Sequence, residues 1–284
     1  MREHDPSRTA LRVAMHRAAH QILDTPRVFS DPLAVRMVGE ESMARLLAAP
    51  EGTGQTSMSR GIRAFLAARS RYAEDELQKA LTRGVRQYVI LGAGLDTFAY
   101  RQPYPRDALR VFEVDHPATQ EWKCSCLERA GIPVPVSLTF APVNFESETL
   151  GEGLARAGFD STRTAFFSWL GVTQYLTGES VSATLRYVAS MPAGSTIVFD
   201  YALSPSLLSP KAREAFEKLA HHVARAGEPF QTFFDPSGLS SDLMSMGFSQ
   251  IEDVGPDEIN ARYFQGRTDD LRVRGFTRIM NAQV

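Results

Sequence analysis

The sequence has few cysteines, no long hydrophobic run and no excess of charge of one sign. Cys124 and Cys126 are the two cysteines in 284 residues, so no disulfide framework exists and a reducing, cytoplasmic setting is expected. The longest apolar runs reach about half of the ~20 residues that cross a bilayer, and no signal-peptide pattern is found, so a membrane span is not expected. With 31 basic and 33 acidic residues, the net charge of -2 lacks the basic excess of a nucleic-acid-binding protein.

The composition is that of an ordinary globular protein. Hydrophobic residues make up 43% of the chain and charged residues 23%, which excludes disordered and collagen-like classes. A chain of this length buries roughly three quarters of its unfolded surface, so it needs neither disulfides nor a metal for stability. Residues 1–83 hold 13 Lys/Arg and 10 Asp/Glu, and an anionic ligand is therefore expected near the N-terminal end.

Helical spacing of apolar residues dominates the first 83 residues. Helices are predicted over residues 7–23, 32–49 and 59–81. Arg69 falls on the apolar stripe of the third helix, whereas Arg71 points elsewhere. Because a buried guanidinium needs an anionic partner, Arg69 is expected to bind either a ligand carboxylate or an acidic side chain within the helical layer.

From residue 84 onward, short β-rich runs alternate with helices. Strands are predicted at residues 87–91, 109–114, 137–142, 165–170, 196–201, 250–254 and 275–282. Nearly continuous apolar strands that alternate with helices indicate a parallel sheet covered on both faces. A helical insertion is predicted over 202–247, with its best helix at 210–226. The expected organisation is one compact unit, with a helical N-terminal cap over 1–83 and an α/β core over 84–284.

The segment Val89-Ile90-Leu91-Gly92-Ala93-Gly94-Leu95-Asp96-Thr97 is a strand that runs into a glycine turn. Gly92 and Gly94 would let the backbone approach a nucleoside, and Asp115, 21 residues after Gly94, ends the second strand at a spacing that suits the ribose hydroxyls. The alternative is a tight turn with Asp115 capping the next helix. Thr97 stands where a dinucleotide fingerprint has its third glycine, which disfavours NAD and favours a single adenosyl group with an amino-acid tail. Arg69 is the natural partner for the carboxylate of that tail.

Several segments together form a longer pattern: Ala68–Tyr72, Leu91–Thr97 with Tyr100-Arg101, Phe112–Pro117, Asp31–Ala34, Val143–Glu146, Ser168–Leu176 and Phe199–Tyr201. This pattern resembles the leucine carboxyl methyltransferase family over essentially the whole chain. It is most similar to the bacterial branch of S-adenosylmethionine (SAM)-dependent O-methyltransferases associated with polyketide and other secondary metabolism. The resemblance implies the class I, Rossmann-like methyltransferase fold, with a seven-stranded, mostly parallel sheet, a helical N-terminal cap and an inserted helical segment.

The resemblance also implies SAM as the cofactor and a set of residues that bind it. Together with the glycine-turn argument, it gives Arg69, Gly92, Gly94, Asp115, Asn144, Phe145 and Leu170. Arg69 would hold the methionine carboxylate and Asp115 the ribose. Asn144 and Phe145 match an Asp-Leu pair that contacts adenine in many relatives. Leu170 replaces an acidic residue of the eukaryotic members, so only a backbone or packing role is expected of it.

The chemistry of the acceptor decides whether a base is needed. A carboxylate is already ionised at pH 7, whereas a phenol or alcohol benefits from a base. Weak candidates for a catalytic group are Tyr175, Tyr201, His116, Asp200, His221 and His222. The aromatic side chains of Phe166, Phe167, Trp169 and Tyr175 could line a dry acceptor site, or they could be ordinary core.

No metal site is expected, because His16 and His20 have no convincing third ligand and Cys124-Ser125-Cys126 is not a CxxC motif. The leading hypothesis is a SAM-dependent O-methyltransferase that acts on a small, anionic metabolite, with a carboxylate preferred over a phenol. The alternatives are an NAD-dependent oxidoreductase and a non-catalytic nucleotide-binding protein.

Overall fold

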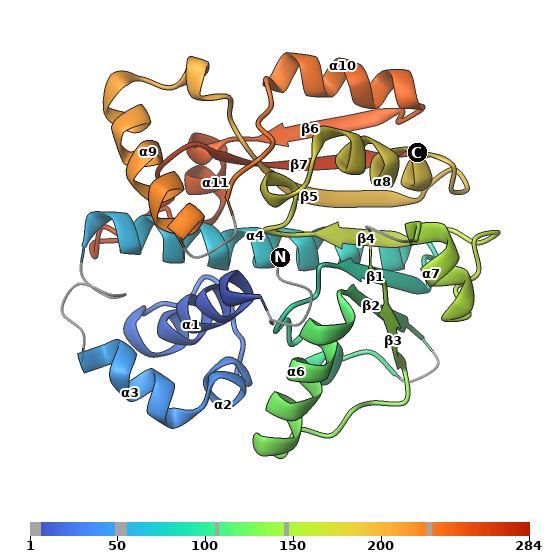
Figure 1. Cartoon of the computed structure of the whole chain (residues 1–284), viewed down its shortest axis with the longest axis horizontal. Helices are drawn as coiled ribbons and strands as arrows, with labels where there is room; N and C mark the ends of the chain where they lie inside the picture. The colour runs from blue at the N-terminus through green and yellow to red at the C-terminus, as the bar shows by residue number, and fades with distance from the viewer. Residues whose placement is uncertain (1–6, 49–55, 106–107, 145–147, 226–228) are drawn as a thin grey trace.

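A single seven-stranded sheet forms the centre of the protein (Figure 1). The computed structural model describes residues 7–48, 56–105, 108–144, 148–225 and 229–284. The strands are β1 (Gln87–Leu91), β2 (Arg110–Asp115), β3 (Leu138–Pro142), β4 (Phe166–Trp169), β5 (Thr196–Ala202), β6 (Gln250–Val254) and β7 (Thr277–Gln283). Their order is β3-β2-β1-β4-β5-β7-β6, and β7 alone runs antiparallel to its two neighbours. The predicted seven-stranded, mostly parallel sheet is confirmed.

The central strands are apolar on both faces because helices cover both. Every residue of β1 and β5 is buried. Along β1, Tyr88 and Ile90 pack into the core beneath the long helix α4 (Ser57–Thr82), whereas Val89 and Leu91 pack into the core on the other face. That second core includes residues of α7 (Leu150–Arg156), α8 (Gly178–Ala189) and α10 (Pro236–Met246). The alternation along β1 follows the two-residue period of a strand.

The N-terminal helices differ from the prediction at one point. Helix α1 (Arg8–Leu23) begins at its N-cap Ser7, and α4 covers the predicted helix over 59–81. The single helix predicted over 32–49 is wrong: the chain forms α2 (Ala34–Val38) and α3 (Glu40–Ala48). Gly39 separates them with a φ of 88°, a backbone conformation that glycine adopts readily and that no α-helix contains.

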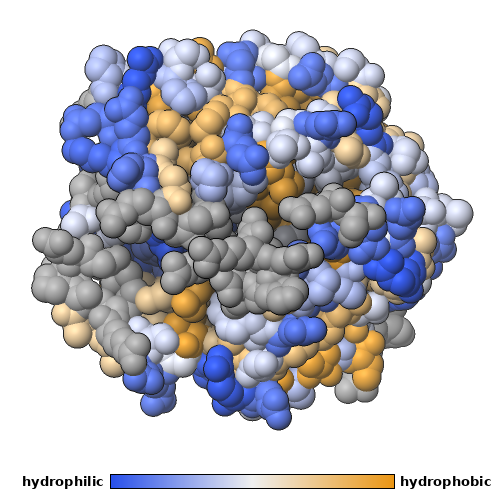
Figure 2. All heavy atoms as spheres, in the orientation of Figure 1, coloured by the Kyte–Doolittle hydropathy of each residue, from blue (hydrophilic) through white to orange (hydrophobic). Residues whose placement is uncertain are grey.

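The remaining helices are α5 (Phe98–Arg101), α6 (Pro117–Arg129), α9 (Pro210–Arg225) and α11 (Pro256–Tyr263), with 3₁₀ turns η1 (Thr173–Tyr175) and η2 (Pro205–Leu207). Helix α9 lies beside the sheet in the predicted insertion, and its outer side is polar (Figure 2). Its inner residue Phe216 packs against Phe230, Phe233 and Phe276. No helix in the described ranges has the length and apolar character of a membrane span.

Candidate active site

The glycine turn after β1 leaves no room for side chains. Gly92 and Gly94 have φ values of 64° and 46°, which are left-handed conformations. A Cβ atom on Gly92 would lie 2.3 Å from the Cγ2 atom of Val172, and one on Gly94 would lie 3.0 Å from the Cβ atom of Ala10. The turn is therefore enclosed by α1 on one side and by the segment after β4 on the other.

Asp115 lies at the end of β2, directly beside this turn. Its Oδ2 atom accepts a hydrogen bond of 2.5 Å from the backbone N–H of Gly94, and its Oδ1 atom accepts one of 2.7 Å from the N–H of His116. Burial raises the pKa of Asp115, and the two N–H donors partly offset that rise. The carboxylate is held in one orientation by the backbone, with further acceptor lone pairs for a ligand.

Asp115 and the glycine turn line a cavity of about 830 Å³, which we call the glycine-loop cavity. Its walls also include the ends of β1 and β4, one face of α1 with its N-cap (Ser7, Thr9, Ala10, Val13, Ala14 and Arg17), and Leu170, Gly171, Val172, Tyr175, Leu176 and Thr177. Arg69, His116, Asn144 and Leu170 are among the lining residues. The cavity lies at the carboxyl ends of β1, β2 and β4, where open parallel sheets bind their ligands.

Arg69 is buried and paired with an acidic residue from the sheet. Its Nη1 atom donates a hydrogen bond of 2.7 Å to Oδ2 of Asp200 on β5. The other carboxylate oxygen of Asp200 accepts a hydrogen bond from the backbone N–H of Gly171. An ion pair within the helical layer was one of the two expectations for Arg69; the structure shows an ion pair, but its partner comes from the sheet, and Arg69 also lines the glycine-loop cavity. A guanidinium has five N–H donors, so a ligand carboxylate can bind beside Asp200.

A second cavity of about 570 Å³ lies along α4, and we call it the α4 cavity. Most of its wall is apolar: Val13, Ile62, Phe65, Leu66, Ala202, Ala212, Phe230 and Phe276. Its charged residues are Arg12, Arg69, Arg274 and Asp200, and the last of these is paired with Arg69. The two cavities share Thr9, Val13, Arg69, Gly171 and Tyr175, so they meet at one junction.

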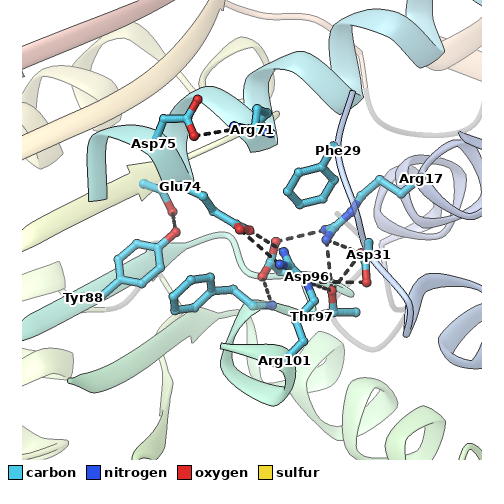
Figure 3. A network of polar contacts seen from close by, with 12 residues as sticks. Arg17, Phe29, Asp31, Arg71, Glu74, Asp75, Tyr88, Asp96, Thr97 and Arg101 are labelled. Atoms are coloured by element: carbon cyan, nitrogen blue, oxygen red, sulfur yellow. Dashed lines mark hydrogen bonds and ion pairs between the residues drawn. The ribbon is translucent and has the colours of Figure 1, made fainter. Parts of the chain in front are cut away.

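A buried polar network fixes α1 against the glycine turn (Figure 3). Arg17 of α1 donates to Asp31 at 2.5 Å, to Asp96 at 2.9 Å and to Thr97 Oγ1 at 3.1 Å. Arg101 contacts the same network and pairs with Glu74 of α4. Burial opposes ionisation of Asp96, but nearby cations, Arg17 first among them, lower its pKa. The hydroxyl of Thr97 also donates to Asp31 at 2.8 Å. Thr97 is thus used to hold the cap, at the position where dinucleotide-binding turns have a glycine.

The sequence profile of the leucine carboxyl methyltransferase family matches residues 10–189. The chain belongs to this family. A relative from Bacillus subtilis (strain 168), YktD, carries the name of an S-adenosyl-L-methionine-dependent methyltransferase and is 35% identical over 95% of both chains. A relative from Mycobacterium sp. (strain KMS) with the same type of name is 34% identical over 69% of this chain and 65% of its own length.

Solved structures support the fold. A crystal structure described as that of a methyltransferase from Thermobifida fusca superposes with a TM-score of 0.51 and 13% sequence identity, over 94% of this chain and 93% of the other. Another, of a DUF574 family protein from Streptomyces avermitilis, also gives 0.51 at 13% identity, over 94% and 96% of the two chains. The predicted class I fold is confirmed, and the protein is a SAM-dependent methyltransferase, as predicted. Neither alternative from the sequence, the oxidoreductase or the non-catalytic protein, is supported by these matches.

The structure brings most of the predicted cofactor residues of this methyltransferase together. Arg69, Gly92, Gly94, Asp115, Asn144 and Leu170 all line the glycine-loop cavity. Phe145 lies outside the described residues. These placements agree with the predicted roles, which remain predictions.

The weak catalytic candidates lie in different environments. Tyr175 lines both cavities, whereas the hydroxyl of Tyr201 donates to Asp253 at 3.0 Å and Tyr201 lines neither. His116 caps α6, where its Nδ1 atom accepts from the N–H of Ala118. Asp200 forms an ion pair with Arg69, and His221 is exposed on α9. The structure does not describe the side chain of His222.

The aromatic residues of β4 are core and not a wall of the acceptor site. Phe166, Phe167 and Trp169 are at most 1% exposed and line neither cavity. Phe167 packs edge-on against Phe159, and Trp169 packs against Phe199. Of the four aromatic residues proposed for the site, the structure places Tyr175 alone there.

Four residues of α1 line the α4 cavity and were not predicted to do so: Thr9, Arg12, Val13 and His16. His16 was considered as a metal ligand with His20, but His20 bonds to Asp24 at 2.7 Å and to the backbone N–H groups of Val28 and Phe29. His16 instead lines the α4 cavity together with Arg12, one turn earlier. The four-residue spacing of Arg12 and His16 puts them on one face of α1, which was the available signal.

Proposed function

We propose that this methyltransferase transfers the methyl group of SAM to an oxygen atom of a small anionic metabolite. A carboxylate is the preferred acceptor and a phenolic hydroxyl the alternative. The observation that carries the proposal is the junction of the two cavities at Arg69, Gly171 and Tyr175. SAM would occupy the glycine-loop cavity and the acceptor the α4 cavity, so that the two reactants meet where the cavities join.

The residues of the glycine-loop cavity suit the parts of SAM. The carboxylate of Asp115, held by two backbone donors, would accept hydrogen bonds from the ribose hydroxyls. Arg69, oriented by Asp200, would bind the methionine carboxylate. Gly92 and Gly94 admit the ligand close to the backbone, whereas Asn144 and Leu170 would contact the adenine and its surroundings.

The α4 cavity favours an acceptor that is already ionised. When bound, SAM supplies an electrophilic methyl group, and an ionised carboxylate can accept it without losing a proton. Burial, with the charges of Arg12 and Arg63, lowers the pKa of His16 to about 4, so this imidazole is a weak base for a phenol. Arg12, Arg69 and Arg274 against Asp200 give the cavity an excess of positive charge, which attracts an anion.

The helical additions and the core would line different parts of the two cavities. The cap over 1–83 and the insertion over 202–247 supply most of the α4 cavity, and the core over 84–284 supplies the ends of the strands. These parts would act as one compact unit. A role in cytoplasmic secondary metabolism is proposed from the sequence resemblance to the polyketide branch and from the low cysteine content.

Calorimetry with SAM tests the cofactor site. We expect Asp115→Ala to weaken SAM binding by about tenfold or more, because hydrogen bonds to a charged group contribute roughly 1.5–3 kcal/mol. Asp242→Ala, at an exposed position on α10, is the matched control and should bind SAM as the wild type does. Equal affinity of the wild type and Asp115→Ala would remove Asp115 from the cofactor site.

The type of acceptor oxygen can be determined chemically. Incubation of the enzyme with methyl-labelled SAM and an extract of the source organism should label a small metabolite. Mild alkali then releases labelled methanol from a methyl ester but not from a phenolic methyl ether. Label that resists alkali would show that the acceptor is a hydroxyl and not a carboxylate.

A further inference from the structure

The α4 cavity has a basic end, which is lined by Arg12 and His16 of α1 and by Arg274. A Cβ atom on Gly61 would lie 3.4 Å from the Cβ atom of Arg274, so Arg274 is placed beside the first half of α4. His16 and Arg12 lie one helical turn apart on α1 and line the same cavity as Gly61 and Arg274. The α4 cavity meets the glycine-loop cavity at Arg69, Gly171 and Tyr175, and along α1 at Thr9 and Val13.

The spacing along α4 gives the length of the cavity. Gly61, Ile62, Phe65, Leu66 and Arg69 of this helix all line it. At 1.5 Å per residue, the rise from position 61 to position 69 is about 12 Å. The residues between the two ends are apolar, with Phe65 and Leu66 on α4 and Phe276 and Ala202 from the sheet side. A compact polar molecule would leave most of this wall uncovered.

Two polar groups at the basic end have no partner among the residues that the structure describes. His16 is 9% exposed, and its buried Nδ1 atom has no hydrogen-bond partner in the described part of the chain. Arg12, which also lines the cavity, makes no ion pair with any described residue. Buried polar atoms are normally paired in native proteins, so the Nδ1 atom of His16 is an exception, and the half-buried Arg12 beside it offers a cation to an anionic ligand. Arg274 already pairs with Asp270 at 2.7 Å and adds positive charge to the same end.

We propose that the α4 cavity binds an elongated, apolar acceptor whose anionic group is anchored by Arg12 and His16 of α1. This inference rests on the proposed function, because the position of the methyl group follows from SAM in the glycine-loop cavity. Arg12 and His16 are then residues that determine specificity for the acceptor.

Two fluorescent probes of the same skeleton test the anchor. The anionic probe is 8-anilinonaphthalene-1-sulfonate, and the neutral probe is N-phenyl-1-naphthylamine, which lacks the sulfonate. We expect the wild type to bind the anionic probe more tightly. Arg12→Gln should weaken the anionic probe about tenfold and leave the neutral probe within about twofold, because one charge-assisted contact is lost. Arg71→Gln, on the exposed side of α4 and paired with Asp75, is the matched control and should change neither.

A second variant fixes where the probes bind. Ala212 lines the α4 cavity, and Ala212→Trp should fill it and weaken both probes. Equal binding of the anionic probe by the wild type and Arg12→Gln, or undiminished binding by Ala212→Trp, would overturn the anchor. Calorimetry with SAM on the same proteins separates the two proposals. If the wild type binds SAM but Arg12→Gln does not weaken the anionic probe, the anchor alone is contradicted. A wild type that does not bind SAM contradicts the proposed function.

Discussion

At the scale of single residues, His16 shows how a cavity controls the charge of the group that lines it. Burial removes water from its imidazole, and Arg12 and Arg63 add unfavourable positive charge. Both effects disfavour the protonated ring and lower its pKa from 6.5 to about 4. His16 is therefore neutral at physiological pH and can act as a hydrogen-bonding group in an otherwise cationic end of the α4 cavity.

This lowered pKa makes stability depend on pH with a defined sign. Between pH 6.5 and about 4 the unfolded state binds a proton on His16 that the folded state does not, so stability falls as the pH falls through this range. The contribution is present above pH 6.5 and amounts to about 3 kcal/mol by linkage. We expect His16→Gln to lose less stability than the wild type between pH 7 and pH 4.5 in urea unfolding. Parallel losses in the two proteins would show that His16 is not the group responsible.

At the scale of secondary-structure elements, the Arg17 network joins α1, the segment before α2, the glycine turn and α4. Asp31 is fully buried and accepts hydrogen bonds from both Arg17 and Thr97. Through Arg101 and Glu74 the same network reaches α4. The helix α1 is thus attached to the glycine turn and to α4 by charges that are buried or mostly withdrawn from water.

Removing one charge from this network should be costly. Asp31→Asn keeps the shape of the side chain but leaves Arg17 with less compensation in a buried site, so we expect a loss of about 3 kcal/mol in the free energy of unfolding. Glu214→Gln is the control, because Glu214 pairs with Lys218 on the exposed side of α9 and its loss should change the stability little. Urea denaturation measures the loss in both variants, and the m-values are expected to stay unchanged. Similar losses in the two variants would mean that the network is not a special support of the cap.

The elements that the sequence predicts well are those with a local signal. The strand β1, the glycine turn and Asp115 follow from periodicity and spacing, and the long helix α4 follows from its apolar stripe. The break at Gly39 was missed because the apolar residues on either side fit one continuous helix. The sequence shows that Thr97 stands where dinucleotide-binding turns have a glycine. It does not show that Thr97 belongs to the Arg17 network, because Arg17 lies 80 residues away in the chain.

At the scale of the whole molecule, the α4 cavity is assembled from parts that are far apart in the sequence. Its wall combines residues 9–16 of α1, residues 61–69 of α4, the ends of β4 and β5, the insertion and residues 274–277 before and within β7. No local sequence pattern encodes such a surface. Asp115 could be predicted from its spacing to the glycine turn, whereas the partner of Arg69 lies 131 residues away and could not. Asp200 was considered as a base, and its pairing with Arg69 became visible only when β5 and α4 were packed together.

The junction of the two cavities couples them, and Gly171 is the position that tests this coupling. Its φ is 79°, and a Cβ atom there would lie 2.7 Å from Nη2 of Arg69. We expect Gly171→Ala to displace Arg69 and strain the backbone by about 1–2 kcal/mol.

Because Arg69 lines both cavities, Gly171→Ala should weaken SAM in calorimetry and the anionic naphthalene probe in fluorescence, whereas Asp115→Ala should weaken SAM alone and Arg12→Gln the probe alone. Gly178→Ala is the control, since Gly178 starts α8 and a Cβ atom there meets nothing within 4 Å. A Gly171→Ala protein that loses one ligand and retains the other would show that the cavities bind independently, and the methyl donor and acceptor would then not meet at Arg69.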